Sequence, residues 1–205
     1  MEEKPSDFPR VRPDGSPLKP LTQVLLERRA SARFTPEEVP EEYLEAILRF
    51  GTQAPSGYNL QPWRFVVVRD AENRQRLQRV AFNQQKIAEA PVVVIAFGMS
   101  EDWKRTAPEV FSEGAARGAG DPSKAERAAE SAVGFVSKLI PEAWVNRQTM
   151  IALTTMMIVA EAYGFDTAPM EGFDAEGVRR EFGLPEEAEV VALLAVGRAA
   201  PPDKP

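Results

Sequence analysis

The feature that most constrains the fold is a long apolar segment, residues 142–163. Its apolar residues, among them Trp144, Leu153 and Met157, fall on most faces of a helix. A helix that is apolar nearly all round must be buried on most sides. The segment therefore predicts a central buried helix that Gly164 ends, and we expect part of its surface to lie against a partner subunit.

Strands and shorter helices are expected around this helix. Three apolar runs predict strands at residues 65–68, 91–97 and 189–196, and residues 165–169 are expected to form a short extended segment. Helical spacing or capping signals predict helices over residues 20–29, 35–51, 70–90, 124–139 and 175–182, with Pro40 as a second possible start of the 35–51 helix. A chain of 205 residues is expected to form one domain, or one domain with an excursion. The Pro-rich ends predict a flexible N-terminal arm, residues 1–20, and a flexible tail, residues 199–205.

The composition excludes several kinds of chemistry. The chain has no histidine and no cysteine, so a Ser-His-Asp triad, a thiolate nucleophile and a His- or Cys-ligated metal site are all excluded, and no metal is expected. A net charge of −6 argues against a nucleic-acid or membrane-surface partner. No apolar run of about 18 residues is present. We therefore expect a cytoplasmic protein whose chemistry, if it is an enzyme, comes from other acids and bases or from a cofactor.

The first candidate motif is Arg29-Ala-Ser-Ala-Arg33. In an extended segment the side chains of Arg29, Ser31 and Arg33 point to one side. Two guanidinium groups around a hydroxyl suit a phosphate, because each can donate paired hydrogen bonds to its oxygens. A solvated charge run is the alternative.

The second motif is the loop Pro55-Ser-Gly-Tyr-Asn59, which leads into the strand predicted at residues 65–68. A polar loop that a buried strand holds in place is a common position for a binding site. An ordinary connection between a helix and a strand is the alternative.

Two further motifs lie later in the chain. Asn83 and Lys86 are three residues apart and would share one face of the predicted 70–90 helix, where an amide and an ammonium could recognise a ring that bears carbonyl oxygens. A surface pair is the alternative. In the segment 169–174, Gly172 permits a tight turn or a close approach of the backbone to a ligand, and Asp174 can cap the following helix.

Taken together, the four motifs are similar in type and order to those of the FMN-dependent nitroreductase family, which also contains flavin NAD(P)H oxidases. The resemblance covers about residues 21–197. It implies an α+β fold, with a mainly antiparallel sheet surrounded by helices, in one FMN-binding domain, residues 21–198. It also implies that the excursion 99–140 shapes the substrate pocket, and that an intertwined homodimer holds two FMN molecules at its interface.

The resemblance assigns residues to the parts of FMN. It implies that the phosphate is held by Arg29, Ala30, Ser31 and Arg33, with Arg198 as a further contact. It implies that the ring is reached from the other subunit by Pro55, Ser56, Gly57 and Asn59. It places Asn83 and Lys86 at the pyrimidine edge, and Glu171 and Gly172, in the motif that begins at Pro169, near flavin N5.

The resemblance also implies an activity. NADH or NADPH would reduce the flavin, and a nitroaromatic, quinone or similar acceptor would then take two electrons in a ping-pong mechanism. Lys86, Glu171 and Gly172 are the expected catalytic positions, with Lys86 stabilising the negative charge that develops on the ring. Tyr58 and Phe111 are the expected substrate-pocket residues, although the aromatic residues Trp103, Phe111 and Phe135 could instead pack the excursion. The alternatives are a reductive dehalogenase or flavin-fragmenting enzyme of the same fold, an FMN-binding protein without turnover, and a flavin-free interaction protein.

Overall fold

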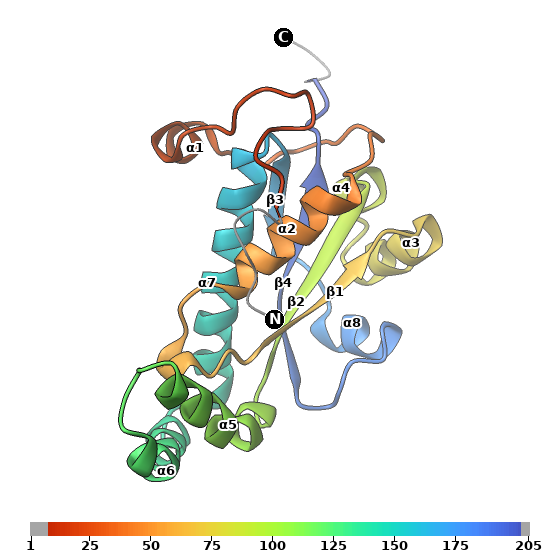
Figure 1. The fold of residues 1–205 in the computed structure, drawn as a ribbon. Helices are drawn as coiled ribbons and strands as arrows, with labels where there is room; N and C mark the ends of the chain where they lie inside the picture. The colour runs from red at the N-terminus through yellow and green to blue at the C-terminus, as the bar shows by residue number, and fades with distance from the viewer. Residues whose placement is uncertain (1–7, 202–205) are drawn as a thin grey trace.

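A four-stranded antiparallel sheet forms the centre of the protein, whose computed structural model describes residues 8–201 (Figure 1). The strands are β1 (Trp63–Val68), β2 (Val92–Met99), β3 (Asp166–Met170) and β4 (Ala188–Gly197). Their order in the sheet is β1-β2-β4-β3, and every neighbouring pair is antiparallel. Strands β1 and β3 are therefore the two edges of the sheet. The expected α+β fold with an antiparallel sheet is confirmed.

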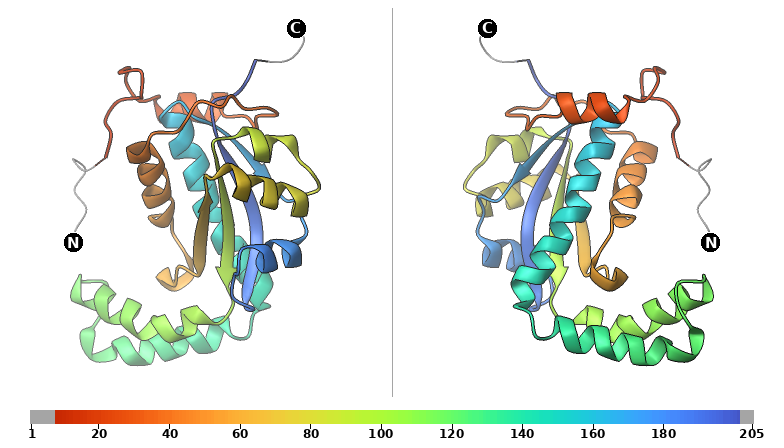
Figure 2. Two further views of the ribbon diagram at one scale, coloured as in Figure 1. Left: turned by 90° about the vertical axis from the view of Figure 1, so that its right-hand side faces the viewer. Right: turned by 90° about the vertical axis from the view of Figure 1, so that its left-hand side faces the viewer.

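Helices cover both faces of this sheet. They are α1 (Leu21–Glu27), α2 (Glu41–Thr52), α3 (Ala71–Val80), α4 (Gln85–Glu89), α5 (Asp102–Ala116), α6 (Ala125–Val136), α7 (Pro141–Ala162) and α8 (Ala175–Glu181). Figure 2 shows α2 and α7 on one face, α3, α4 and α8 on the other, and α5 and α6 paired beyond one end of the sheet. Among residues 8–201, no helix has the length and apolar character needed to cross a membrane.

The two central strands are buried on both faces, which explains their almost continuous apolar sequences. In β2, Val92, Val94 and Ala96 pack toward α2 and α7. Their neighbours Val93 and Ile95 pack toward the layer of α3, α4 and α8. Successive side chains of a strand point to opposite faces, so a strand between two helical layers needs apolar residues at every position.

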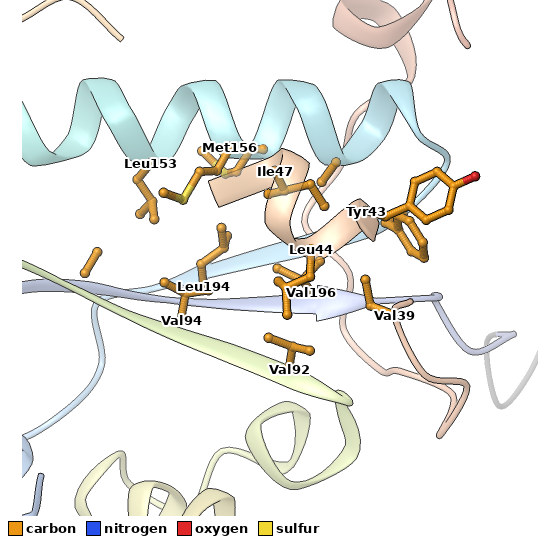
Figure 3. Packing of buried hydrophobic residues seen from close by; sticks show 14 of the residues in the cluster. Val39, Tyr43, Leu44, Ile47, Val92, Val94, Leu153, Met156, Leu194 and Val196 are labelled. Carbon is orange, nitrogen blue, oxygen red and sulfur yellow. The ribbon is translucent and has the colours of Figure 1, made fainter. Parts of the chain in front are cut away.

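The 22-residue helix α7 is the central buried helix that the sequence predicts. Leu153 and Met156 are fully buried between α7, α2 and the sheet, next to Ile47 and Leu194 (Figure 3). Gly164 follows the helix with φ = 82°, a left-handed conformation that favours glycine.

Two expected helix boundaries are wrong. No helix begins at Thr35, because this segment is tied to the end of β4: Phe34 forms an antiparallel bridge to Ala199, and the Thr35 N–H donates to the Arg198 carbonyl at 2.8 Å. Helix α2 starts at Glu41, after the second start signal at Pro40. The expected continuous helix 70–90 is instead two helices, α3 and α4, separated by a tight turn.

The N-terminal residues that the structure describes are packed against α2 and α7. Phe8 stacks against Phe50 with a ring separation of 4.6 Å, and the Tyr163 hydroxyl donates to the Pro9 carbonyl at 3.1 Å. Lys19 pairs with the buried Glu161 at 2.5 Å. Residues 8–20 of the expected flexible arm are thus held by specific contacts, whereas residues 1–7 of that arm and residues 202–205 of the expected tail lie outside the described residues.

Candidate functional site

The proposed phosphate motif lies beside the edge strand β3 and bends at Ala32, so it is not extended throughout as the sequence predicted. Ala30 forms a parallel bridge to Thr167, and the Ser31 N–H donates to the Thr167 carbonyl at 3.0 Å. The exposed Arg29 guanidinium donates only to backbone carbonyls, those of Leu26 and Arg28 at 2.8 Å. Within the described residues, no carboxylate pairs with Arg29, so its positive charge is available to an anion.

Arg33 is held differently from Arg29. Its Nε donates to Glu89 Oε1 at 2.6 Å, and the backbone N–H of Phe34 donates to the other oxygen of this carboxylate at 3.3 Å. Glu89 is the last residue of α4. The phosphate motif is therefore fixed on one side to β3 and on the other side to α4.

The turn between α3 and α4 changes the expected relation between Asn83 and Lys86. Phe82 and Asn83 have φ values of 53° and 57°, so Asn83 lies in a left-handed turn and does not share a helix face with Lys86. Asparagine tolerates this conformation better than most residues, which explains why the chain breaks here. Lys86 is the second residue of α4 and is half-buried. Its ammonium has no hydrogen bond or ion pair to any residue in the described part of the chain.

The same turn contacts the segment that follows β3. The Gln84 side-chain amide donates to the Gly172 carbonyl at 2.7 Å, and the Asp174 N–H donates to the Val80 carbonyl at 2.8 Å. Glu171 and Gly172 are exposed beside the turn, and Pro169 lies within β3. The third and fourth motifs are thus brought together.

One region of the molecule consequently holds three of the four motifs. Helix α4 and the segment that contains β3 meet at one end through the hydrogen bond from Gln84 to Gly172. At the other end, Glu89 of α4 and Thr167 of β3 both bond to the phosphate motif. From Thr167 to Met170, β3 spans about 10 Å at about 3.3 Å per residue, and the chain continues beyond it to Gly172. The region is long enough for a ligand with a phosphate at one end and a ring at the other.

The loop 55–59 lies elsewhere in the chain. It packs on the first turns of α7, where the Gly57 N–H donates to Gln148 Oε1 at 2.8 Å. A Cβ atom at Gly57 would lie 3.4 Å from the Trp144 indole nitrogen, which is ordinary van der Waals contact, so the loop and α7 are closely packed here. The loop leads into β1, and β1 and β3 are opposite edges of the sheet. A single chain therefore does not bring Pro55, Ser56, Gly57 or Asn59 to the other three motifs.

Unusual backbone conformations occur both in and just after loop 55–59 and in the turn between α3 and α4. Five residues other than glycine have positive φ in the described structure, namely Tyr58, Asn59, Gln61, Phe82 and Asn83. Each conformation is unfavourable for a residue with a side chain and persists only where its surroundings hold it. All five lie in or next to motifs that the sequence alone had indicated.

The aromatic residues of the excursion divide into packed and exposed groups. Phe111 is half-buried and packs against the cluster between α5, α6 and the start of α7. Its position follows from the helical spacing that turns it toward Ala107. Phe135 is the exposed residue instead, and its ring lies 6.2 Å from that of Tyr58. Trp103 is buried against Trp144.

Arg198 also differs from its expected role. Its guanidinium donates to the Gly164 carbonyl at 2.8 Å and to Glu37 at 3.3 Å, and it lies over the Phe165 ring at 5.1 Å. These partners belong to the C-terminal end of α7 and to the segment before α2. The structure therefore does not direct this side chain to Arg29 or Arg33.

Sequence reasoning missed three supporting residues: Gln84, Glu89 and Gln148. Gln148 lies in the mostly apolar α7 and is 8% exposed, but the sequence alone does not show that it is buried. Gln84 lies between Asn83 and Lys86 of the third motif, and Glu89 is the last residue of a short helix. Nothing in the local sequence indicates that either residue contacts a residue distant in the sequence.

Comparison with known proteins agrees with this fold and with the motifs. A model described as the nitroreductase family matches residues 25–198. A protein named NADH dehydrogenase from Thermus thermophilus is 37% identical over 185 residues, which make up 90% of this chain and 89% of the relative. The oxygen-insensitive NAD(P)H nitroreductase of Salmonella typhimurium is 28% identical over 182 residues, 82% of each chain.

Solved structures share the architecture. A complex with FMN from Exiguobacterium sibiricum superposes with a TM-score of 0.81 over 91% of both chains, at 23% identity. A nitroreductase-like protein from Streptococcus mutans superposes with a TM-score of 0.78 and is 27% identical, over 88% of this chain and 89% of that one. The chain belongs to the nitroreductase family. The two curated relatives described above have the names of oxidoreductases, so both the family resemblance and the enzyme class expected from it are confirmed.

Proposed function

We propose that this protein is an FMN-dependent oxidoreductase that takes two electrons from NADH or NADPH and gives them to a nitroaromatic, quinone or similar acceptor. The proposal rests on one observation. The phosphate motif, the Asn83–Lys86 turn and the Glu171–Gly172 segment lie along one strand and one short helix, although they are up to 143 positions apart in the sequence. The site is proposed to act in a cytoplasmic homodimer.

The phosphate end of this region suits a dianion. Among residues 8–201, the Arg29 guanidinium has only backbone carbonyls as partners, and the half-buried Ser31 adds a hydroxyl to the same motif. Hydrogen bonds from a cation to a phosphate are about twice as strong as those between neutral groups. Arg29, Ser31 and Arg33, with the Ala30 backbone, are the proposed phosphate ligands. Arg198 is left out because its partners lie at the end of α7.

The other end suits the flavin ring. When bound, FMN would supply the hydride and electron chemistry that the side chains of this protein lack. Lys86 has no ion-pair partner in the part of the chain that the structure describes, and its positive charge at the ring edge would stabilise negative charge in the reduced state. Asn83 adds an amide from a turn of fixed geometry. Gly172 has no side chain to block the approach of a planar ring, and the Gln84 hydrogen bond fixes its peptide group.

A second copy of the chain would complete the site. Loop 55–59 and the other three motifs lie at opposite edges of the sheet, so a shared ligand requires another subunit. The surface of the chain offers an apolar patch for association: Leu21, Leu25 and Leu26 of α1 are 62%, 59% and 73% exposed. Exposed apolar residues grouped in this way commonly mark an interface.

The acceptor would bind where the partner's loop and excursion cover the ring. Tyr58 and Phe135 are both about half exposed, and their rings meet edge to face, so each leaves ring surface that a flat aromatic acceptor could contact. NAD(P)H and the acceptor would use this space in turn, as a ping-pong mechanism requires. Phe135 takes the place of Phe111 in this proposal.

An absorbance spectrum tests the proposed function. The purified protein is incubated with FMN, desalted, and then treated anaerobically with NADH or NADPH. We expect a retained flavin spectrum that bleaches with at least one donor. A retained spectrum that neither donor bleaches would favour an FMN-binding protein without this activity, and failure to retain flavin would refute the proposal.

Light scattering of the same sample tests the subunit arrangement. We expect the mass of a dimer, and we expect Leu25→Glu to produce monomers that have lost FMN. A wild-type monomer that retains FMN would contradict the shared site.

A further inference from the structure

We propose that Glu89 is a positioning residue, which holds the Arg33 side chain in the orientation that receives the FMN phosphate. This inference rests on the proposed function. Each oxygen of the Glu89 carboxylate bonds to a different part of the phosphate motif. Oε1 accepts from Arg33 Nε at 2.6 Å, and Oε2 accepts from the Phe34 N–H at 3.3 Å.

The geometry of arginine explains why one hydrogen bond at Nε can orient the whole group. The guanidinium is planar and rigid, so a partner at Nε restricts the plane in which the two terminal nitrogens lie. The Phe34 bond restricts the carboxylate itself, because it ties the second oxygen to the backbone. The Arg33 and Glu89 side chains are 42% and 23% exposed, so the pair is only partly screened by water.

Glu89 also relates the phosphate end of the site to its ring end. It lies in the same helix as Lys86, three residues further on, which corresponds to a rise of about 4.5 Å. Ile87 and Ala90 are fully buried and fix this short helix to the core. A helix anchored in this way keeps the proposed phosphate ligand Arg33 and the proposed ring ligand Lys86 at a constant separation.

A simpler role for Glu89 predicts a different result. If its carboxylate only neutralised Arg33, it would compete with the phosphate, and its removal would strengthen FMN binding. If it positions Arg33, Glu89→Gln weakens this restraint, because an NH2 group replaces one of the two acceptor oxygens and faces a donor. FMN must then order the Arg33 side chain on binding. Ordering one such side chain weakens binding by about threefold to tenfold.

A comparison with riboflavin distinguishes effects on phosphate binding from effects on ring binding, because riboflavin has the ring and the sugar chain of FMN without the phosphate. Dissociation constants for FMN and riboflavin are measured by flavin fluorescence at constant ionic strength, in the wild type and in Glu89→Gln. We expect Glu89→Gln to weaken FMN binding by about threefold to tenfold and to leave riboflavin binding unchanged. Glu38→Gln is the matched control. It removes the same charge from an exposed residue of the following segment, one that has no ion pair among the described residues, and it should leave both constants unchanged.

A double variant tests whether the effect passes through Arg33. In an Arg33→Ala background, Glu89→Gln should cause no further loss of FMN affinity, since the residue to be positioned is gone. Equal FMN affinity in Glu89→Gln and wild type, stronger FMN binding in Glu89→Gln, or an equal loss for both flavins would overturn the positioning role while leaving the proposed function intact. A wild-type protein that binds neither flavin would refute the proposed function and this inference with it.

Discussion

The side-chain amide of Gln84 donates a 2.7 Å hydrogen bond to the carbonyl oxygen of Gly172, across 88 positions of the sequence. The bond joins the left-handed turn at Phe82 and Asn83 to the segment that follows β3. Two of the four sequence motifs depend on this contact for their relative position.

Gln84→Ala should therefore disturb the ring end of the site and not its phosphate end. Loss of one hydrogen bond of this kind corresponds to about 1 kcal/mol. We expect the affinities for FMN and for riboflavin to fall by the same factor, about fivefold, in fluorescence titrations. Gln85→Ala changes the neighbouring exposed amide and should have no effect. A loss confined to FMN would contradict the assignment of this contact to the ring end.

Arg29→Ala should act at the phosphate end. A charge-assisted hydrogen bond to phosphate would be lost, so we expect FMN binding to weaken by about 1–2 kcal/mol while riboflavin binding stays constant. The difference between the two flavins should shrink at high salt, because ions screen an exposed charge. Arg10→Ala removes the same charge from another exposed residue and serves as the control. Unchanged FMN affinity in Arg29→Ala would remove this residue from the phosphate site.

Lys86→Ala should affect chemistry more than folding. The Lys86 ammonium has no protein partner in the described residues, so its removal should change the melting temperature little. Without its positive charge at the ring edge, flavin reduction by NAD(P)H should slow by about tenfold or more in anaerobic stopped-flow measurements. Lys86→Arg, which keeps the charge, should retain more of the rate. Equal reduction rates in the wild type and Lys86→Ala would reject the proposed role.

Gly98→Ala should destabilise the contact between β2 and α7. A Cβ atom at position 98 would lie 2.7 Å from Val145 Cβ, within the packed core. We expect the free energy of unfolding to fall by about 1–3 kcal/mol in urea denaturation. Gly134→Ala is the matched control: it lies in α6 with no atom within 4 Å of its added Cβ, and it should be neutral or stabilising by up to about 1 kcal/mol.

Asp102 should make stability depend on pH at the acid end. A hydrogen bond from Arg105 lowers the pKa of Asp102 below its usual value of 3.8, partial burial opposes this shift, and the charges of Arg105 and Arg64 add to it. Because the folded-state pKa is depressed, the stabilisation is complete above pH 3.8 and is lost as the pH falls through the folded-state pKa.

Asp102→Asn should accordingly be less stable than the wild type by about 1 kcal/mol at pH 7. The difference should diminish below pH 3.8 in thermal melts. Glu109→Gln changes an exposed carboxylate of the same helix and should match the wild type throughout. A difference between Asp102→Asn and the wild type that stayed constant down to pH 2 would mean that the ion pairs with Arg64 and Arg105 do not stabilise the fold.

Local patterns in the sequence determined much of the architecture. The apolar runs at residues 91–97 and 189–196 predicted strands because β2 and β4 lie between two helical layers. The nearly uniform apolar character of residues 142–163 predicted α7, and Gly164 marked its end. Arg29 and Arg33 indicated a phosphate site because their chemistry and alternation are local properties.

Only the tertiary structure decided how these parts meet. The pairing order of the strands placed loop 55–59 and the other motifs at opposite edges, and no local pattern encodes that order. The contacts of Gln84 with Gly172, of Glu89 with Arg33 and of Gln148 with Gly57 join residues 56 to 91 positions apart. Local propensity predicted a helix at both Thr35 and Asn83. At Thr35, the hydrogen bond to the end of β4 prevents the helix. At Asn83, the contacts of the turn with the segment after β3 accompany a left-handed backbone instead. Periodicity reports which face of an element is buried, whereas contacts between distant residues depend on how all the elements pack.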